Sequence, residues 1–127
     1  MSSSLDIGKK LVDFCKLGKS LDAINTLYAD DIVSVEPMAM PGDSAEKKGI
    51  AAIRGKHDWW NDNHQVHSAV VNGPFPHGDR FIVHFKYDVT ATKGPMKDKR
   101  FTMEEGALYT GKNGKIAKEE FFYSMGG

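Results

Sequence analysis

The strongest constraint on how this chain can fold is residues 80–92, where apolar and polar side chains alternate strictly. One face takes Phe81, Val83, Phe85, Tyr87 and Val89, and the other takes Arg80, His84, Lys86 and Asp88. Because side chains on a strand point alternately to its two faces, this period predicts a strand with one buried face. Three more runs are strand-like, namely 65–73, 100–110 and 115–125. Turn residues separate them at 73–79, 93–95 and 111–114.

Helical patterns come before these strands. Apolar residues at spacings of three and four predict a helix over 5–17, which Gly18 ends. Ser20 is a candidate cap for a second helix that ends near 29–31. Residues 32–36 read as a short strand that Pro37 ends, and 38–48 read as a loop. A third helix starts near Gly49, with an inner stripe of Ile50, Ile53, His57, Trp60 and His64.

This order predicts one α+β domain over residues 1–127. We expect three N-terminal helices packed on a strongly curved, mostly antiparallel sheet that encloses a pocket. Of the 127 residues, 17 are Lys or Arg and 17 are Asp or Glu, which argues against a nucleic-acid or membrane partner. With a single cysteine, Cys15, and no apolar leader, we expect a cytoplasmic protein.

Two carboxylates lie in rows that the pattern predicts to be buried. Glu105 alternates in register with Phe101, Met103, Ala107 and Tyr109, and Glu119 does so with Ala117, Phe121 and Tyr123. The same alternation puts Ile116 on the outer face, unless a bulge shifts the register. Burial raises a carboxyl pKa, which suits proton transfer near neutral pH. The alternative for each is an ion pair with a lysine or a place at the wet rim of the sheet.

Four further candidates have weaker signals. Glu36 ends a strand directly before Pro37, where binding sites often lie, although an exposed strand-end glutamate fits equally well. His57 and Trp60 lie on the apolar stripe of the third helix, where core packing is the alternative for both. Met38 follows Pro37 in the loop. The histidines have no regular ligand spacing, and no cofactor motif is present, so we expect neither a metal nor a cofactor.

Three segments resemble ketosteroid isomerases and SnoaL-like proteins, which belong to the nuclear transport factor 2-like superfamily with its cystatin-like α+β cone. Residues 27–37 resemble the second helix and first strand of these proteins, 49–54 the start of their third helix, and 114–123 their final hairpin. The resemblance implies that Glu36 is the proton-shuttling base and Glu105 the acid that binds the oxyanion. The family's oxyanion tyrosine falls at Leu11 or Val12, and a supporting tyrosine is replaced by His57.

Two functions follow as hypotheses. The first is a cofactor-free isomerase or cyclase, acting by proton transfer on a small apolar carbonyl compound. Glu36, Glu105 and His57 would be catalytic, and substrate would contact Trp60, Met38, Glu119, Phe121 and Tyr123. The second is a non-catalytic protein that binds a small ligand or serves as a dimeric scaffold. In both cases we expect a homodimer through the outer sheet face, where His84, Leu108 and Phe122 fall.

Overall fold

The computed structural model describes residues 3–39 and 42–123. Its helices are α1 (Ser4–Lys16), α2 (Ser20–Leu27) and α3 (Ile50–Asn63). Its strands are β1 (Tyr28–Val35), β2 (Glu46–Lys48), β3 (His64–His77), β4 (Arg80–Ala91), β5 (Arg100–Lys112) and β6 (Lys115–Phe122). All six form one sheet in the order β2-β1-β6-β5-β4-β3, in which only the β1–β6 pair is parallel.

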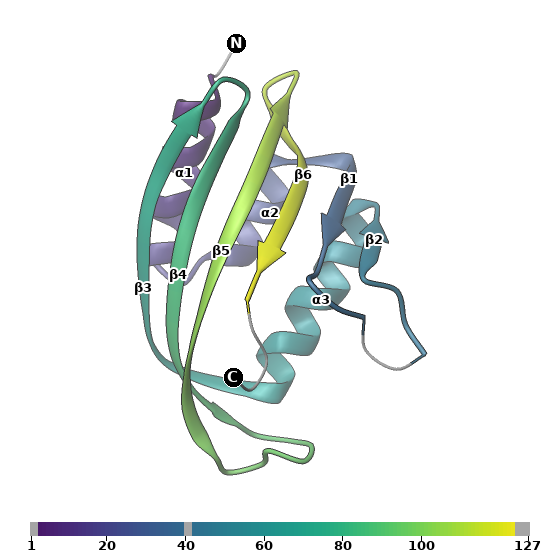
Figure 1. The fold of residues 1–127 in the computed structure, drawn as a ribbon, viewed down its shortest axis with the longest axis vertical. Coiled ribbons are helices and arrows are strands. Elements are labelled where there is room, and N and C mark those ends of the chain that lie inside the picture. Colours follow the sequence, from purple (N-terminus) through teal and green to yellow (C-terminus); the bar gives the residue numbers. More distant parts are fainter. Residues whose placement is uncertain (1–2, 40–41, 124–127) are drawn as a thin grey trace.

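The predicted α+β class is confirmed, and its sheet is mostly antiparallel. Figure 1 shows the long strands bending, with α1 and α2 covering one face of the sheet. The three helices are not consecutive, because α3 follows β1 and β2. Strand β2 lies in the segment that we expected to be a loop, where Val33 pairs with Lys48.

The predicted inner row of β4 is confirmed. Phe81, Val83, Phe85 and Val89 are buried and Tyr87 is half-buried. Phe81, Val83 and Phe85 form one core cluster with Ile7, Leu11 and Val12 of α1 and with Ala23, Ile24 and Leu27 of α2, and Tyr87 packs against this cluster. Both helices therefore form because one apolar stripe of each meets this face of the sheet.

Helix ends and strand ends differ from the sequence-based expectations at several points. Helix α2 ends at Leu27, since β1 begins directly at Tyr28. Ser20 is the first residue of α2 rather than its cap, and the capping residue, Lys19, makes no side-chain cap bond. His64 belongs to β3 and not to the third helix.

The expected turn over 73–79 is largely wrong. Strand β3 continues through Pro74 to His77, with a shift in pairing between Asn72 and Phe75. The strand tolerates proline because β3 is an edge strand, where a missing backbone N–H breaks no ladder on its free side.

A bulge changes the register of β6. Thr110 pairs with Lys118 but Gly111 pairs with Ile116, so Ala117 is the extra residue on β6. Ile116 is therefore fully buried, and its expected place on the outer face is wrong. Beyond the bulge the expected alternation resumes, and Glu119 is buried at 3 % exposure.

Candidate functional site

Glu36 meets a lysine of α3 at the end of β1. Buried Ile53 holds α3 against the core, and Lys56 lies one turn further along the same side of the helix. The Lys56 Nζ is 2.5 Å from Glu36 Oε1 and donates to Ser34 Oγ at 2.8 Å. About a quarter of each charged side chain is exposed, 25 % for Lys56 and 24 % for Glu36.

The second oxygen of Glu36 also has a partner. The Tyr123 hydroxyl donates to Glu36 Oε2 at 2.9 Å. Burial and the negative charge of Glu36 raise the pKa of Tyr123, so this hydroxyl keeps its proton and acts as a donor. Glu36 is thus an oriented carboxylate with one cationic and one neutral donor.

Glu119 is the most buried acid of this cluster. The Tyr28 hydroxyl donates to Glu119 Oε2 at 2.6 Å. Burial raises the pKa of Glu119, and the hydrogen bond from Tyr28, the charge of Lys56 and the Ser34 hydroxyl oppose that rise. Tyr28, Ser34 and Glu119 thus each have a hydrogen-bond partner, as buried polar groups require.

Glu105 differs because no hydrogen bond or ion pair to it occurs within residues 3–39 and 42–123. It lies on β5 opposite Phe85. Burial raises the pKa of Glu105 from its ordinary 4.5 to about 7; the charges of Glu36 and Glu119 add to the rise, and Lys56 opposes it. This carboxyl group can therefore hold or release a proton near neutral pH.

The cluster joins residues from distant parts of the chain. Of the residues predicted for the site, Glu36, Glu105, Glu119, Phe121 and Tyr123 share contacts or charge effects with Lys56 or with one another. The sequence analysis missed Lys56, Ser34 and Tyr28. The position of Lys56, one helical turn after Ile53, was the available signal. We refer below to Glu36, Lys56, Glu105 and Glu119 as the charged cluster.

His57 has its contacts outside the charged cluster. Its Nε2 is 3.3 Å from the Asn61 amide, and its Nδ1 is 3.7 Å from the Asp58 carboxylate. The Nδ1 atom is buried and has no hydrogen-bond partner in the described part of the chain. The geometry thus gives His57 no direct link to Glu36 or Glu105.

Trp60 and Met38 lie nearer the rim. The Trp60 ring stacks on His64 at 3.9 Å and tilts against Tyr87 at 6.0 Å. Tyr87 lies on β4 two residues after Phe85, which is opposite Glu105. Burial and the charge of Glu105 raise the pKa of Tyr87. Met38 is 49 % exposed. An aromatic wall therefore connects α3 to the Glu105 side of the cluster.

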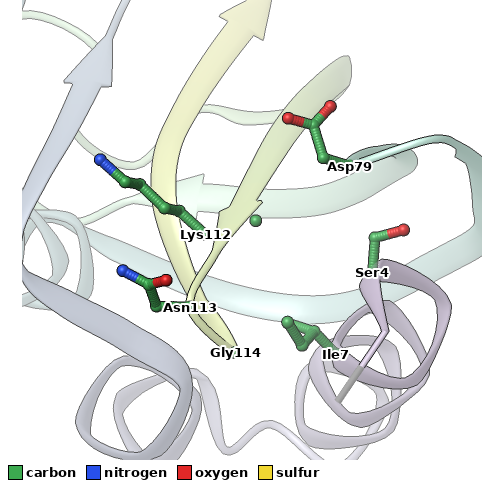
Figure 2. A pocket seen from close by; sticks show the side chains of 7 residues that line it. Ser4, Ile7, Asp79, Lys112, Asn113 and Gly114 are labelled. Carbon is green, nitrogen blue, oxygen red and sulfur yellow. The ribbon is translucent and has the colours of Figure 1, made fainter. Parts of the chain in front are cut away.

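Two shallow hollows lie elsewhere. Figure 2 shows the first, at the start of α1, lined by Ser4, Ile7, Asp79, Lys112, Asn113 and Gly114. The second lies on the outer sheet face over Phe75, Ile82 and Leu108. Neither includes a member of the charged cluster, so the enclosed pocket stays a prediction.

Two searches for other kinds of site gave no result within the described residues. No group of three or more His, Cys, Asp or Glu side chains there is placed to hold a metal ion. Among those same residues, no helix is long and apolar enough to cross a membrane.

Comparison with known proteins gives a consistent result. Residues 3–123 match the model of the SnoaL-like domain. A solved structure from Mesorhizobium loti, named as a candidate SnoaL-like polyketide cyclase, is 41% identical, with a TM-score of 0.87 over 96% of this chain and 100% of that one. No match was found among curated proteins.

More distant structures share the fold. A Bacillus subtilis protein named as a candidate isomerase has 12% identity and a TM-score of 0.75, covering 97% of this chain and 90% of that one. A protein from Catenulispora acidiphila with a ketosteroid isomerase-like fold, solved with trimethylamine, has 19% identity and a TM-score of 0.70, covering 94% and 86%. At these identities the likeness concerns the fold alone.

Proposed function

Because the chain belongs to the SnoaL-like family, we propose that it is a cofactor-free isomerase or cyclase that transfers a proton on a small apolar carbonyl compound. One observation carries this proposal: two neighbouring carboxyl groups have opposite environments. Glu36 is paired with Lys56, whereas Glu105 has no such partner among the described residues and a pKa raised to about 7. Two carboxyl groups in such different environments can serve as the base and the acid of one site.

The roles follow from these environments. Ionised Glu36 takes the proton from the carbon next to the carbonyl group, and the C–H electron pair moves into the enolate. Protonated Glu105 donates a hydrogen bond to the enolate oxygen as charge develops there. Glu36 then returns the proton to another carbon. In a cyclisation, the enolate carbon instead attacks a second carbonyl carbon within the substrate, and the alkoxide formed there takes the proton from Glu36.

The surroundings of the cluster suit an apolar substrate. Phe121 lies under Lys56, and Trp60 and Tyr87 continue the wall toward Glu105. We place substrate among Trp60, Met38, Glu119, Phe121 and Tyr123, in a pocket open near Met38. The name of the Mesorhizobium loti protein, a candidate polyketide cyclase that is 41% identical, supports the same reaction class.

Exchange of α-protons with solvent tests this proposal without knowledge of the product. A panel of small cyclic ketones and β-diketones is incubated in D2O, and loss of the α-proton signal is followed by NMR. We expect catalysed exchange by the wild type and a fall of at least about a hundredfold in Glu36→Gln. Glu104→Gln, which changes an exposed glutamate on β5 beside Glu105, is the control. An unaffected Glu36→Gln rate, or no exchange with any member of the panel, contradicts the proposal.

A non-catalytic ligand-binding role is the second candidate. It is favoured by the place of the family's oxyanion tyrosine, where Leu11 and Val12 are buried in the core at 2 % and 3 % exposure. Tryptophan fluorescence with the same panel separates the two functions. Tight binding with no exchange and no chemical change over hours would support the binding role.

Assembly and location are proposed with the function. We propose a homodimer through the outer sheet face and a cytoplasmic location. The pairing of Gly106 with both His84 and Phe122 puts these residues on one face, with Leu108 two residues along β5. Phe122 is 56 % exposed there, which supports an interface at this face.

A further inference from the structure

Lys56 is the one member of the charged cluster to which the proposed reaction gives no task. An ammonium group has three donors. Two of them serve Glu36 and Ser34, so a third remains available. Because a quarter of the side chain is exposed, a ligand can reach the ammonium from outside.

The surroundings of this ammonium fit a planar ligand with an oxygen at its edge. The face of the Phe121 ring lies 5.0 Å from Nζ, which gives the cation an apolar floor. Leu11 and Val12 fill the place of the family's oxyanion tyrosine with buried hydrocarbon, so no hydroxyl donor comes from that position. A cationic donor on α3 would supply the missing contact.

We propose that Lys56 is a further catalytic residue, which binds the anionic oxygen of the ligand, so that the site takes enols and phenols as their anions. This inference rests on the proposed function, since it names a second donor, beside Glu105, to the enolate oxygen of that reaction. A charge-assisted N–H···O contact strengthens as the oxygen becomes negative, so Lys56 would stabilise the enolate more than the ketone.

The charges of the nearby acids determine how the anion affinity of Lys56 depends on pH. Three acids act on Lys56, namely Glu36 after β1, Glu105 on β5 and Glu119 on β6. The hydroxyls of Tyr28 and Tyr123 donate to two of these acids, Glu119 and Glu36. Lys56 and Glu36 together are neutral, and both tyrosines stay protonated. Ionisation of Glu105 adds a negative charge, so we expect anion affinity to fall as pH rises through about 7.

Binding of a coloured phenolate tests this role without turnover. The probe is 2,4-dinitrophenol, which is fully ionised across the titrated range, from about pH 5.5 to about pH 9. Its absorbance shift is titrated against wild type, Lys56→Met and Lys56→Arg. Lys118→Met is the matched control, because Lys118 lies on β6 with Glu120 as its ion-pair partner.

We expect wild type and Lys118→Met to bind alike, and Lys56→Met to lose about tenfold or more in affinity. Lys56→Arg keeps the charge and should retain part of the binding. Equal binding by Lys56→Met, or no binding of the probe by wild type, overturns the inference. If the probe binds through Lys56 but no ketone exchanges its α-protons, the anion-binding role of Lys56 stands, whereas its catalytic role fails together with the proposed enzyme function.

Glu36→Gln provides a second test that keeps Lys56 in place. Removing the carboxylate charge leaves the ammonium uncompensated, so the phenolate should bind more tightly, by about tenfold. This result does not depend on whether Lys56→Met folds. Unchanged or weaker binding by Glu36→Gln would overturn the assignment of Lys56.

Discussion

At the scale of single residues, Glu105 and Glu119 show how one donor changes a buried acid. Both acids occupy inner rows of the sheet, and burial raises the pKa of both. Glu119 has the Tyr28 hydroxyl as a donor, whereas no such donor reaches Glu105 from the described residues. One acid is therefore held as part of the core, and the other is left free to exchange a proton.

The Tyr28–Glu119 bond should contribute measurably to stability. Tyr28→Phe removes the hydroxyl and leaves a buried carboxyl group without that donor, which should cost about 1–3 kcal/mol in free energy of unfolding. Urea denaturation at neutral pH measures this. Thr90→Val, which removes a hydroxyl that contacts His67 at an exposed site, should cost less than about 1 kcal/mol. Equal losses in the two variants would mean that the buried hydrogen bond contributes no more to stability than the exposed one.

Glu105 should make stability depend on pH. Its pKa is raised in the folded state, so between 4.5 and about 7 the folded chain holds a proton that the unfolded chain has released. Stability therefore falls as pH rises through this range. Glu105→Gln should match wild type below pH 4.5 and exceed it at pH 8 by up to roughly 3 kcal/mol. Urea denaturation across pH measures this difference, with Glu104→Gln as the control. The same pH dependence of stability in both variants would contradict the assignment to Glu105.

At the scale of elements, Gly8 in α1 and Gly55 in α3 have different roles in their helices. Gly8 lets α1 approach the sheet closely, because an added Cβ would lie 2.7 Å from Pro74 Cβ and 3.1 Å from Phe81. Gly55 of α3 faces open space, with nothing within 4 Å of an added Cβ. The first glycine is needed for packing, whereas the second only lowers helix propensity.

The two glycines therefore predict opposite effects of one substitution. Gly8→Ala should destabilise the protein by about 1–3 kcal/mol, since overpacking outweighs the gain in helix propensity. Gly55→Ala should stabilise it by about 0.5–1 kcal/mol. Thermal unfolding of the two variants checks both signs, and a stabilised Gly8→Ala would show that α1 can move away from β3 at no cost.

At the scale of the whole molecule, the two sheet faces have different neighbours. The inner face is covered by the helices, whereas Phe75, Ile82 and Phe122 on the outer face are about half exposed. Ile82 pairs with Phe75 on β3 and with Leu108 on β5, so these side chains form a continuous apolar strip. Such a strip fits the proposed dimer interface.

A charge in the strip should separate the proposed dimer. We expect Ile82→Glu to sediment as a single chain at tens of micromolar, where wild type sediments as two, because an unpaired carboxylate would be buried at the interface. Leu17→Glu is the control, since Leu17 is 69 % exposed at the end of α1, away from the strip. A wild-type mass of one chain would contradict the dimer.

Local periodicity determined much of this fold. Alternation over 80–92 predicted the buried face of β4, and the same period predicted the inward positions of Glu105 and Glu119. It failed at Ile116 and Pro74, because a bulge and an edge position depend on the neighbouring strand rather than on local sequence.

The charged cluster was decided only by the tertiary structure. Glu36 and Glu105 were predictable candidates from a strand end and an alternating row, but Lys56, Ser34 and Tyr28 were not. Helical sequence shows that Lys56 lies near the inner stripe, but not which carboxylate it meets. That depends on how α3 crosses the end of β1, since an ion pair needs two side chains within a few ångströms, here 2.5 Å between Lys56 and Glu36.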